Sequence, residues 1–125
     1  MDPITLATIA LTLIATKATE KVGEKIGEGA IASGKRLLEV LRRKSPDTVK
    51  RLEAAKNPEV IDAEIIEEVK QVAASDPEVQ AAVDATAQAM QQQLGTVVNQ
   101  TQLAEKIGIL IQGGYNPITI DKFEV

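Results

Sequence analysis

The most restrictive feature of this chain is a run near its start that has no charged side chain. Residues Pro3 to Thr16 are proline, aliphatic residues, alanine and threonine only. As a helix this run would be about 21 Å long at 1.5 Å per residue, whereas the hydrocarbon core of a bilayer is about 30 Å thick. One copy is therefore too short to span a membrane in the ordinary way. We expect it either to be buried in a protein core or to enter a membrane cooperatively.

The composition favours helices and argues against most enzyme classes. A chain of 125 residues suits one compact unit with a tail. Its only aromatic residues are Tyr115 and Phe123, so everything before them must form a core from aliphatic side chains, which favours a helical bundle over a β-sandwich. The chain has no cysteine and no histidine, which removes thiolate ligands, disulfides and the commonest general base. We therefore expect no enzymatic activity, no metal and no cofactor.

Charge is distributed unevenly along the chain. Residues 1–44 carry eight basic and five acidic residues, a net charge of +3, whereas residues 45–125 carry six and thirteen, a net charge of −7. The basic excess gathers at Lys35, Arg36, Arg42, Arg43 and Lys44. Such a cluster downstream of an apolar segment can contact anionic lipid. The alternative is a solvated helix end whose cations complement the helix dipole.

The apolar start does not fit a secretory signal peptide. It is preceded by an acid, Asp2, and by no basic residue, and six charged residues separate it from the small-residue triplet Ala30-Ile31-Ala32. A signal peptide has a basic start and a cleavage site directly after the apolar run. We therefore expect a cytoplasmic protein.

The prolines mark the expected helix starts. Each of the five follows Asp, Ser or Asn, which cap helix N-termini, and proline is well tolerated at the first helical position. Four of these pairs predict helices that begin near residues 3, 46, 58 and 77, and Gly95 is expected to end the last helix. We predict an all-α fold: a bundle of about four helices in a domain 1–95, followed by a flexible or β-prone tail, 96–125.

The first helix is expected to continue through a repeated Glu-Lys-x-Gly pattern that contains Gly23 and Gly27. Residues four apart lie on neighbouring turns of one helix side. Each mid-helix glycine costs about 1 kcal/mol relative to alanine, so a close approach of another helix is the expected compensation. That approach can occur in a membrane or inside this bundle, and the sequence favours neither.

The tail is rich in β-branched residues. Two such runs, 107–112 and 118–120, flank Gly113-Gly114-Tyr115-Asn116, a pattern that predicts a strand, a turn and a strand. The first run is uncharged and free of proline, which is typical of cross-β segments. Nothing upstream strongly predicts a strand that it would join. The tail is then left to dock on the bundle, to be disordered, or to pair between chains.

The two ends together resemble a known family. Met1-Asp2-Pro3-Ile4-Thr5-Leu6, the helix junction Ala73-Ala74-Ser75-Asp76-Pro77-Glu78 and the segment Ile109-Leu110-Ile111-Gln112-Gly113 resemble the prokaryotic Bell domain, a relative of the fungal HeLo domain. The resemblance implies a regulated cell-death effector of prokaryotic innate immunity and antiphage defence. An NLR-like receptor with a matching amyloid motif would template the tail. Oligomerisation would then free the N-terminal helix from the bundle, and the helix would permeabilise the membrane by pore formation.

The resemblance also assigns residues and partners. It implies a membrane-active helix face made of Ile4, Leu6, Ile9, Leu11, Leu13 and Ile14. It implies an amyloid motif made of Ile109, Leu110, Ile111, Gln112, Gly113, Ile118 and Ile120. The partners would be further copies of the chain on activation, membrane lipids and the receptor, with no nucleic acid and no small-molecule substrate. The protein would move from the cytoplasm to the cell membrane on activation.

Two other functions stay open at this stage. One is a non-enzymatic adaptor or interaction module whose N-terminal helix is a permanent part of the core. The other is a small membrane-anchored protein of the phage-holin type.

Overall fold

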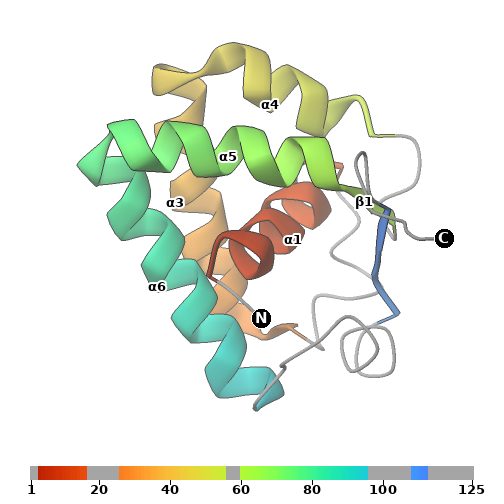
Figure 1. Cartoon of the computed structure of the whole chain (residues 1–125). Helices are drawn as coiled ribbons and strands as arrows, with labels where there is room; N and C mark the ends of the chain where they lie inside the picture. The colour runs from red at the N-terminus through yellow and green to blue at the C-terminus, as the bar shows by residue number, and fades with distance from the viewer. Residues whose placement is uncertain (1–2, 17–25, 56–59, 96–107, 113–125) are drawn as a thin grey trace, which may run out of the picture.

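The computed structural model describes residues 3–16, 26–55, 60–95 and 108–112. These residues form a helical bundle with one small sheet, which confirms the predicted all-α fold. The elements, labelled as in Figure 1, are α1 (Pro3–Ala15), α3 (Glu28–Lys44), α4 (Pro46–Glu53), β1 (Val60–Asp62), α5 (Ala63–Ser75), α6 (Pro77–Leu94) and β2 (Leu110–Gln112).

Helix α1 is the central helix of the bundle. It contacts α3, α4, α5 and α6, and Figure 1 shows it in the middle with the other helices around it. The nine consecutive residues from Thr5 to Leu13 are all buried. A helix that is apolar on every side must be covered on every side in water, so the uncharged run occupies the one position in the bundle where that is possible.

Three of the predicted helix starts are confirmed. Helices α1, α4 and α6 begin at Pro3, Pro46 and Pro77. The Asp76 carboxylate caps α6, because its Oδ1 accepts hydrogen bonds from the backbone N–H groups of Glu78 (2.9 Å) and Val79 (3.3 Å). Gly95 ends α6 with φ 76° and ψ −158°, a backbone conformation that is nearly confined to glycine.

The predicted helix start near residue 58 is wrong. Helix α5 begins at Ala63 and is capped by Asp62, whose Oδ1 accepts a hydrogen bond from the Glu64 backbone N–H at 2.9 Å. The three residues before α5 form β1 instead. They are extended because they pair with β2, a contact between positions about fifty residues apart that no local pattern reveals.

The expected continuous first helix is interrupted at Gly27. Helix α1 ends at Ala15, and α3 begins at Glu28 after Gly27, whose φ is +89°. An α-helix needs a negative φ at every position, so Gly27 interrupts the helix rather than lying within it. The described part of the bundle therefore has five helices.

Strands β1 and β2 form a two-stranded parallel sheet. Val60 pairs with Leu110, Ile61 with Ile111 and Asp62 with Gln112. The expectation that the tail has no strand to join is therefore wrong for residues 110–112. The predicted turn and the second β-branched run lie outside the described residues.

The core consists of two clusters that meet at α1. The β-side cluster contains the residues next to the sheet: Leu6, Ile9, Ala10, Leu13, Ile26, Ala30, Ile61, Ala87, Met90 and Ile109. The α4-side cluster contains Ala7, Leu11, Leu37, Leu38, Val40, Leu41, Val49, Leu52, Ile65, Val69, Ala73, Val79, Ala82 and Val83. Because α1 contributes to both clusters, it joins the two halves of the core.

Candidate functional site

The residues expected to be membrane-active all lie on α1 and face the protein interior. Leu6, Ile9, Leu11 and Leu13 are at most 1% exposed, and Ile4 and Ile14 are half-buried. They do not form a single face. Leu6, Ile9 and Leu13 belong to the β-side cluster, whereas Ile4, Leu11 and Ile14 pack in the α4-side cluster. The apolar surface of α1 therefore extends around the whole helix.

Thr8 and Thr12 of α1, and Thr16 directly after it, bond their hydroxyl groups to carbonyl oxygens one turn earlier. Oγ1 of Thr8 donates to the carbonyl oxygen of Ile4 (2.7 Å), Oγ1 of Thr12 to that of Thr8 (2.9 Å) and Oγ1 of Thr16 to that of Thr12 (2.7 Å). Burying a hydroxyl without such a bond costs about 1–3 kcal/mol. These three threonines consequently behave as nearly apolar residues in any environment that keeps the helix intact.

Gly34 of α3 packs directly against α1. A Cβ atom placed on Gly34 would lie 2.5 Å from Cδ1 of Ile14 and 3.5 Å from Cβ of Ala10. No side chain fits there without movement of Ile14, so the glycine sets the distance between the two helices. Sequence reasoning missed this residue, although the small-residue spacing of Ala30 and Gly34 in α3 carries the signal for close helix packing.

Of the two glycines that were expected to permit close packing in mid-helix, the structure describes Gly27. Gly27 is the residue before α3, and its positive φ is the first reason that glycine is needed there. A Cβ atom on Gly27 would also lie 3.1 Å from the Gln93 side chain of α6. The prediction of a mid-helix glycine contact is therefore wrong for Gly27, and Gly23 lies outside the described residues.

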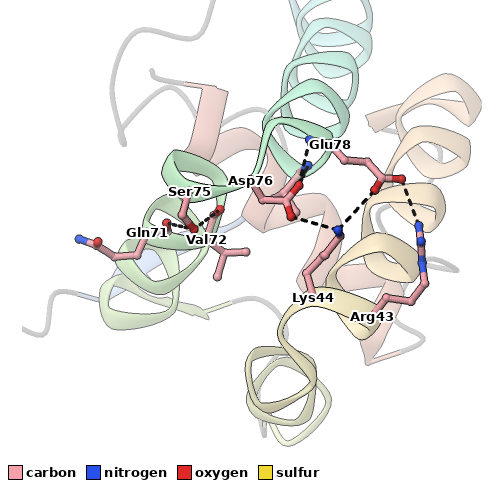
Figure 2. Close-up of polar contacts among 8 residues, drawn as sticks. Arg43, Lys44, Gln71, Val72, Ser75, Asp76 and Glu78 are labelled. Carbon is pink, nitrogen blue, oxygen red and sulfur yellow. Dashed lines mark hydrogen bonds and ion pairs between the residues drawn. The ribbon is translucent and has the colours of Figure 1, made fainter.

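Three residues of the predicted basic cluster are tied to acidic residues. Lys44 Nζ lies 3.3 Å from Oδ2 of Asp76 and 3.9 Å from Oε1 of Glu78, and Arg43 Nη2 lies 3.1 Å from Oε2 of Glu78. Figure 2 shows these side chains connecting the end of α3 to the start of α6. Arg42 pairs in the same way with Glu53 of α4 at 3.0 Å. Exposed pairs of this kind contribute about 0–1 kcal/mol each, so they orient the helix ends more than they stabilise the fold.

The remaining two basic residues, Lys35 and Arg36, are exposed on the outer side of α3. Within the described ranges neither forms an ion pair. They border a shallow surface depression together with Glu39, Arg42 and Glu78. The depression mixes cations with acids and opens to solvent. If anionic lipid contacts this helix, Lys35 and Arg36 can bind it without first breaking an ion pair.

Asp76 has a perturbed pKa because of its role as a cap. Partial burial acts to raise its pKa, but the hydrogen bonds from the Val79 N–H, from Lys44 and from the Glu78 N–H outweigh burial and hold the pKa below its ordinary value. Nearby, Ser75 Oγ donates to the carbonyl oxygens of Val72 (3.1 Å) and Gln71 (3.3 Å), as Figure 2 shows. The junction of α5 and α6 is thus held by its own polar groups, which indicates a structural role for this carboxylate.

A second polar connection joins α4 to α5. Glu68 accepts a hydrogen bond from Thr48 Oγ1 at 2.9 Å and a charge-assisted one from Arg51. The Thr48 hydroxyl also lies 2.7 Å from that of Ser45, the residue before α4. Thr48 is 1% exposed, so the acid satisfies a buried hydroxyl group and its role here is structural.

The predicted amyloid motif is partly in contact with the bundle. Ile109 is fully buried in the β-side cluster, Ile111 packs against that cluster, and residues 110–112 pair with β1. Of the three alternatives for the tail, docking on the bundle describes these residues. Gly113, Ile118 and Ile120 lie outside the described residues.

The described ranges offer little for catalysis or metal binding. No group of three or more acidic side chains in them is arranged to hold a metal ion. In the same ranges no helix has both the length and the hydropathy to cross a bilayer. The features of these ranges that bear on function are the buried helix α1 and the tail strand β2, which pairs with β1 and packs Ile111 against the β-side cluster.

Comparisons with known proteins add no assignment. No protein-family model, no curated protein and no solved structure matches the chain.

Proposed function

We propose that this chain is a non-enzymatic cell-death effector that permeabilises membranes with α1. At rest the bundle holds α1 in its centre, and assembly through the tail releases it. The observation that supports the proposal is that α1 is buried around its whole circumference, and that Thr8 and Thr12 bond their hydroxyls to carbonyls of the same helix. These two hydroxyls stay satisfied when the helix leaves the protein core for a lipid environment, where an unpaired polar group costs several kcal/mol.

Release of α1 needs a driving force from outside the bundle. Burying Leu6, Ile9, Leu11 and Leu13 is worth about 1.5–3 kcal/mol each, or about 6–12 kcal/mol together. The whole free energy of unfolding of a typical domain is about 5–15 kcal/mol. The resting protein therefore keeps α1 buried, and a membrane that offers α1 an equally apolar environment recovers most of this cost.

Assembly of several copies compensates for the short length of α1. The 13 residues of α1 make a helix about 20 Å long, shorter than the roughly 30 Å hydrocarbon core. Several helices brought together multiply the apolar contact with the bilayer. In this proposal the partners are other copies of the chain, membrane lipids and an NLR-like receptor with a matching amyloid motif. The protein moves from the cytoplasm to the cell membrane of a prokaryote under attack.

One observation favours a second candidate, an adaptor whose α1 never leaves. Because α1 belongs to both core clusters, its removal opens the entire interior and not a single face. A binding module with a permanent central helix would show the same packing. The two candidates differ in one measurable property, which is whether α1 must move for the protein to act.

A disulfide lock between α1 and α3 tests this difference. The chain has no cysteine of its own, and a Cβ on Gly34 would lie 3.5 Å from that of Ala10, at the short end of the disulfide range of about 3.5–4.5 Å. The variant is Ala10→Cys with Gly34→Cys, and Ile14→Val removes the Cδ1 atom that would otherwise collide. The control carries Ala10→Cys and Ile14→Val only.

The assay is dye leakage from vesicles that contain anionic lipid, after addition of the protein and fibrils of a peptide of residues 96–125. We expect leakage from the reduced variant and from the control under both conditions, and none from the oxidised variant. Leakage from the oxidised variant equal to that from the reduced one would show that α1 need not separate from α3, contrary to the proposed release. Intact vesicles with every reduced protein would overturn the effector proposal itself.

A further inference from the structure

Strand β1 and the β-side cluster next to it hold the extended segment β2. We call this place on the bundle the acceptor site. Residues 60–62 offer their main chain to residues 110–112 in a parallel register, and Figure 1 shows the two strands side by side at one edge of the helices. Addition of a strand to an open edge is a common mode of peptide recognition, in which main-chain hydrogen bonds give affinity and side-chain pockets give specificity.

The site also has a side-chain component. Ile109 and Ile111 are two residues apart, so in an extended segment they point to the same side. Ile109 is 0% exposed and Ile111 packs against the same β-side cluster, which includes Ile61 of β1 and Leu6 of α1. The acceptor site therefore selects an extended segment with aliphatic side chains at alternate positions.

The number of residues between α6 and this segment is large enough for the segment to reach a neighbouring bundle. Twelve residues, 96–107, separate Gly95 at the end of α6 from Gly108, and twelve extended residues reach about 40 Å. Gly108 has a φ of +71°, and a Cβ placed on it would meet no atom within 4 Å. The segment thus begins at a glycine whose backbone conformation other residues rarely adopt and which has open space beside it.

We propose that β1 accepts residues 108–112 of a second copy of this chain, so that two copies exchange their β2 segments. The exchanged dimer makes the same contacts as the closed monomer, so concentration decides between the two forms. A pair of three-residue strands is marginal by itself, so the main cost of releasing the segment is the exposure of Ile109, which is 0% exposed in the closed form. This inference rests on the β1–β2 contact and is independent of any role in cell death.

Cross-linking between copies tests the exchange. Because the chain has no cysteine, a tagged Val60→Cys protein and an untagged Leu110→Cys protein each carry one thiol, at positions that are register partners. The two full-length proteins are mixed, incubated over a range of concentrations and treated with a short bismaleimide. The matched control replaces Val60→Cys with Lys70→Cys, an exposed position on α5.

We expect a cross-linked pair of tagged and untagged copies whose yield rises with concentration and exceeds that of the control roughly tenfold, because docking holds the thiols together. A chain that carries both Val60→Cys and Leu110→Cys can be cross-linked internally in dilute solution, which keeps β2 on its own β1. This protein should remain monomeric at high concentration. Cross-linking within that single chain but never between copies would overturn the proposal. The proposal would also fail if the Lys70→Cys control gave the same yield of cross-linked pairs as Val60→Cys. It would fail too if the mixed proteins formed sedimenting fibrils without a cross-link at Val60→Cys.

Discussion

The packing of Gly34 against α1 predicts that Gly34→Ala destabilises the wild-type chain but stabilises a chain that also carries Ile14→Val. Gly34→Ala adds a methyl group whose carbon would lie 2.5 Å from Cδ1 of Ile14, well inside the contact distance of two carbon atoms. Ile14 must therefore move. Ile14→Val deletes the Cδ1 atom, and the nearest remaining neighbours of the new methyl group are then Cβ of Ala10 at 3.5 Å and Cγ1 of residue 14 at 3.9 Å, both ordinary contacts.

Two opposing effects determine the magnitude. Overpacking of a core costs about 1–3 kcal/mol, whereas replacing a mid-helix glycine by alanine gains about 1 kcal/mol. Gly34→Ala should therefore lower the free energy of unfolding by about 0–2 kcal/mol in the wild-type chain. In the Ile14→Val background the collision is absent, and the same change should raise the free energy of unfolding by up to about 1 kcal/mol.

Urea unfolding of the four proteins, followed by circular dichroism, measures both values. Circular dichroism is preferred because the chain has no tryptophan and its aromatic residues are in the tail. The coupling between the two positions should be about 1–3 kcal/mol, as for residues in direct contact. If Gly34→Ala changes stability equally in both backgrounds, Ile14 does not lie against Gly34, and the packing described for α1 is wrong.

Three further predictions concern single positions. Gly27→Ala should destabilise by about 1–2 kcal/mol because its φ is positive, while Gly29→Ala, where an added Cβ meets Ala89 at 3.6 Å, should change little; urea midpoints compare them. Leu11→Ala, at a fully buried site, should cost about 2–5 kcal/mol in the same assay. Asp76 has a lowered pKa, so its stabilisation exists above its ordinary pKa and disappears as the pH falls. Asp76→Ala should therefore lower the thermal midpoint at pH 7, and the difference should shrink below about pH 4.

Local signals predicted much of the bundle. Starts at Pro3, Pro46 and Pro77 and the end at Gly95 depend on the preferences of residues a few positions apart, and the structure has them where they were predicted. The expected side-chain cap is present at Asp76 but not at Ser45, which makes no cap hydrogen bond to α4. The central position of α1 also follows from the sequence, since an uncharged helix has no side that suits water.

Contacts between distant residues could not be predicted in the same way. Val60–Asp62 is a strand because it pairs with residues 110–112, and three residues are too few for a period-two pattern. Gly27 continues a regular Glu-Lys-x-Gly repeat, yet its conformation breaks the helix where α6 packs beside it. Of the candidate site, the α1 residues could be found from composition, whereas Gly34 and the β1 acceptor emerge only from packing.

The central position of α1 has a consequence during synthesis. This helix leaves the ribosome before any of the helices that cover it, and the last of them, α6, ends at Leu94. At about 5–20 residues per second, the roughly 80 residues in between take about 4–16 s to make. During that time the apolar segment lacks its complete cover, so it is accessible to a chaperone or a membrane surface before its own bundle is complete.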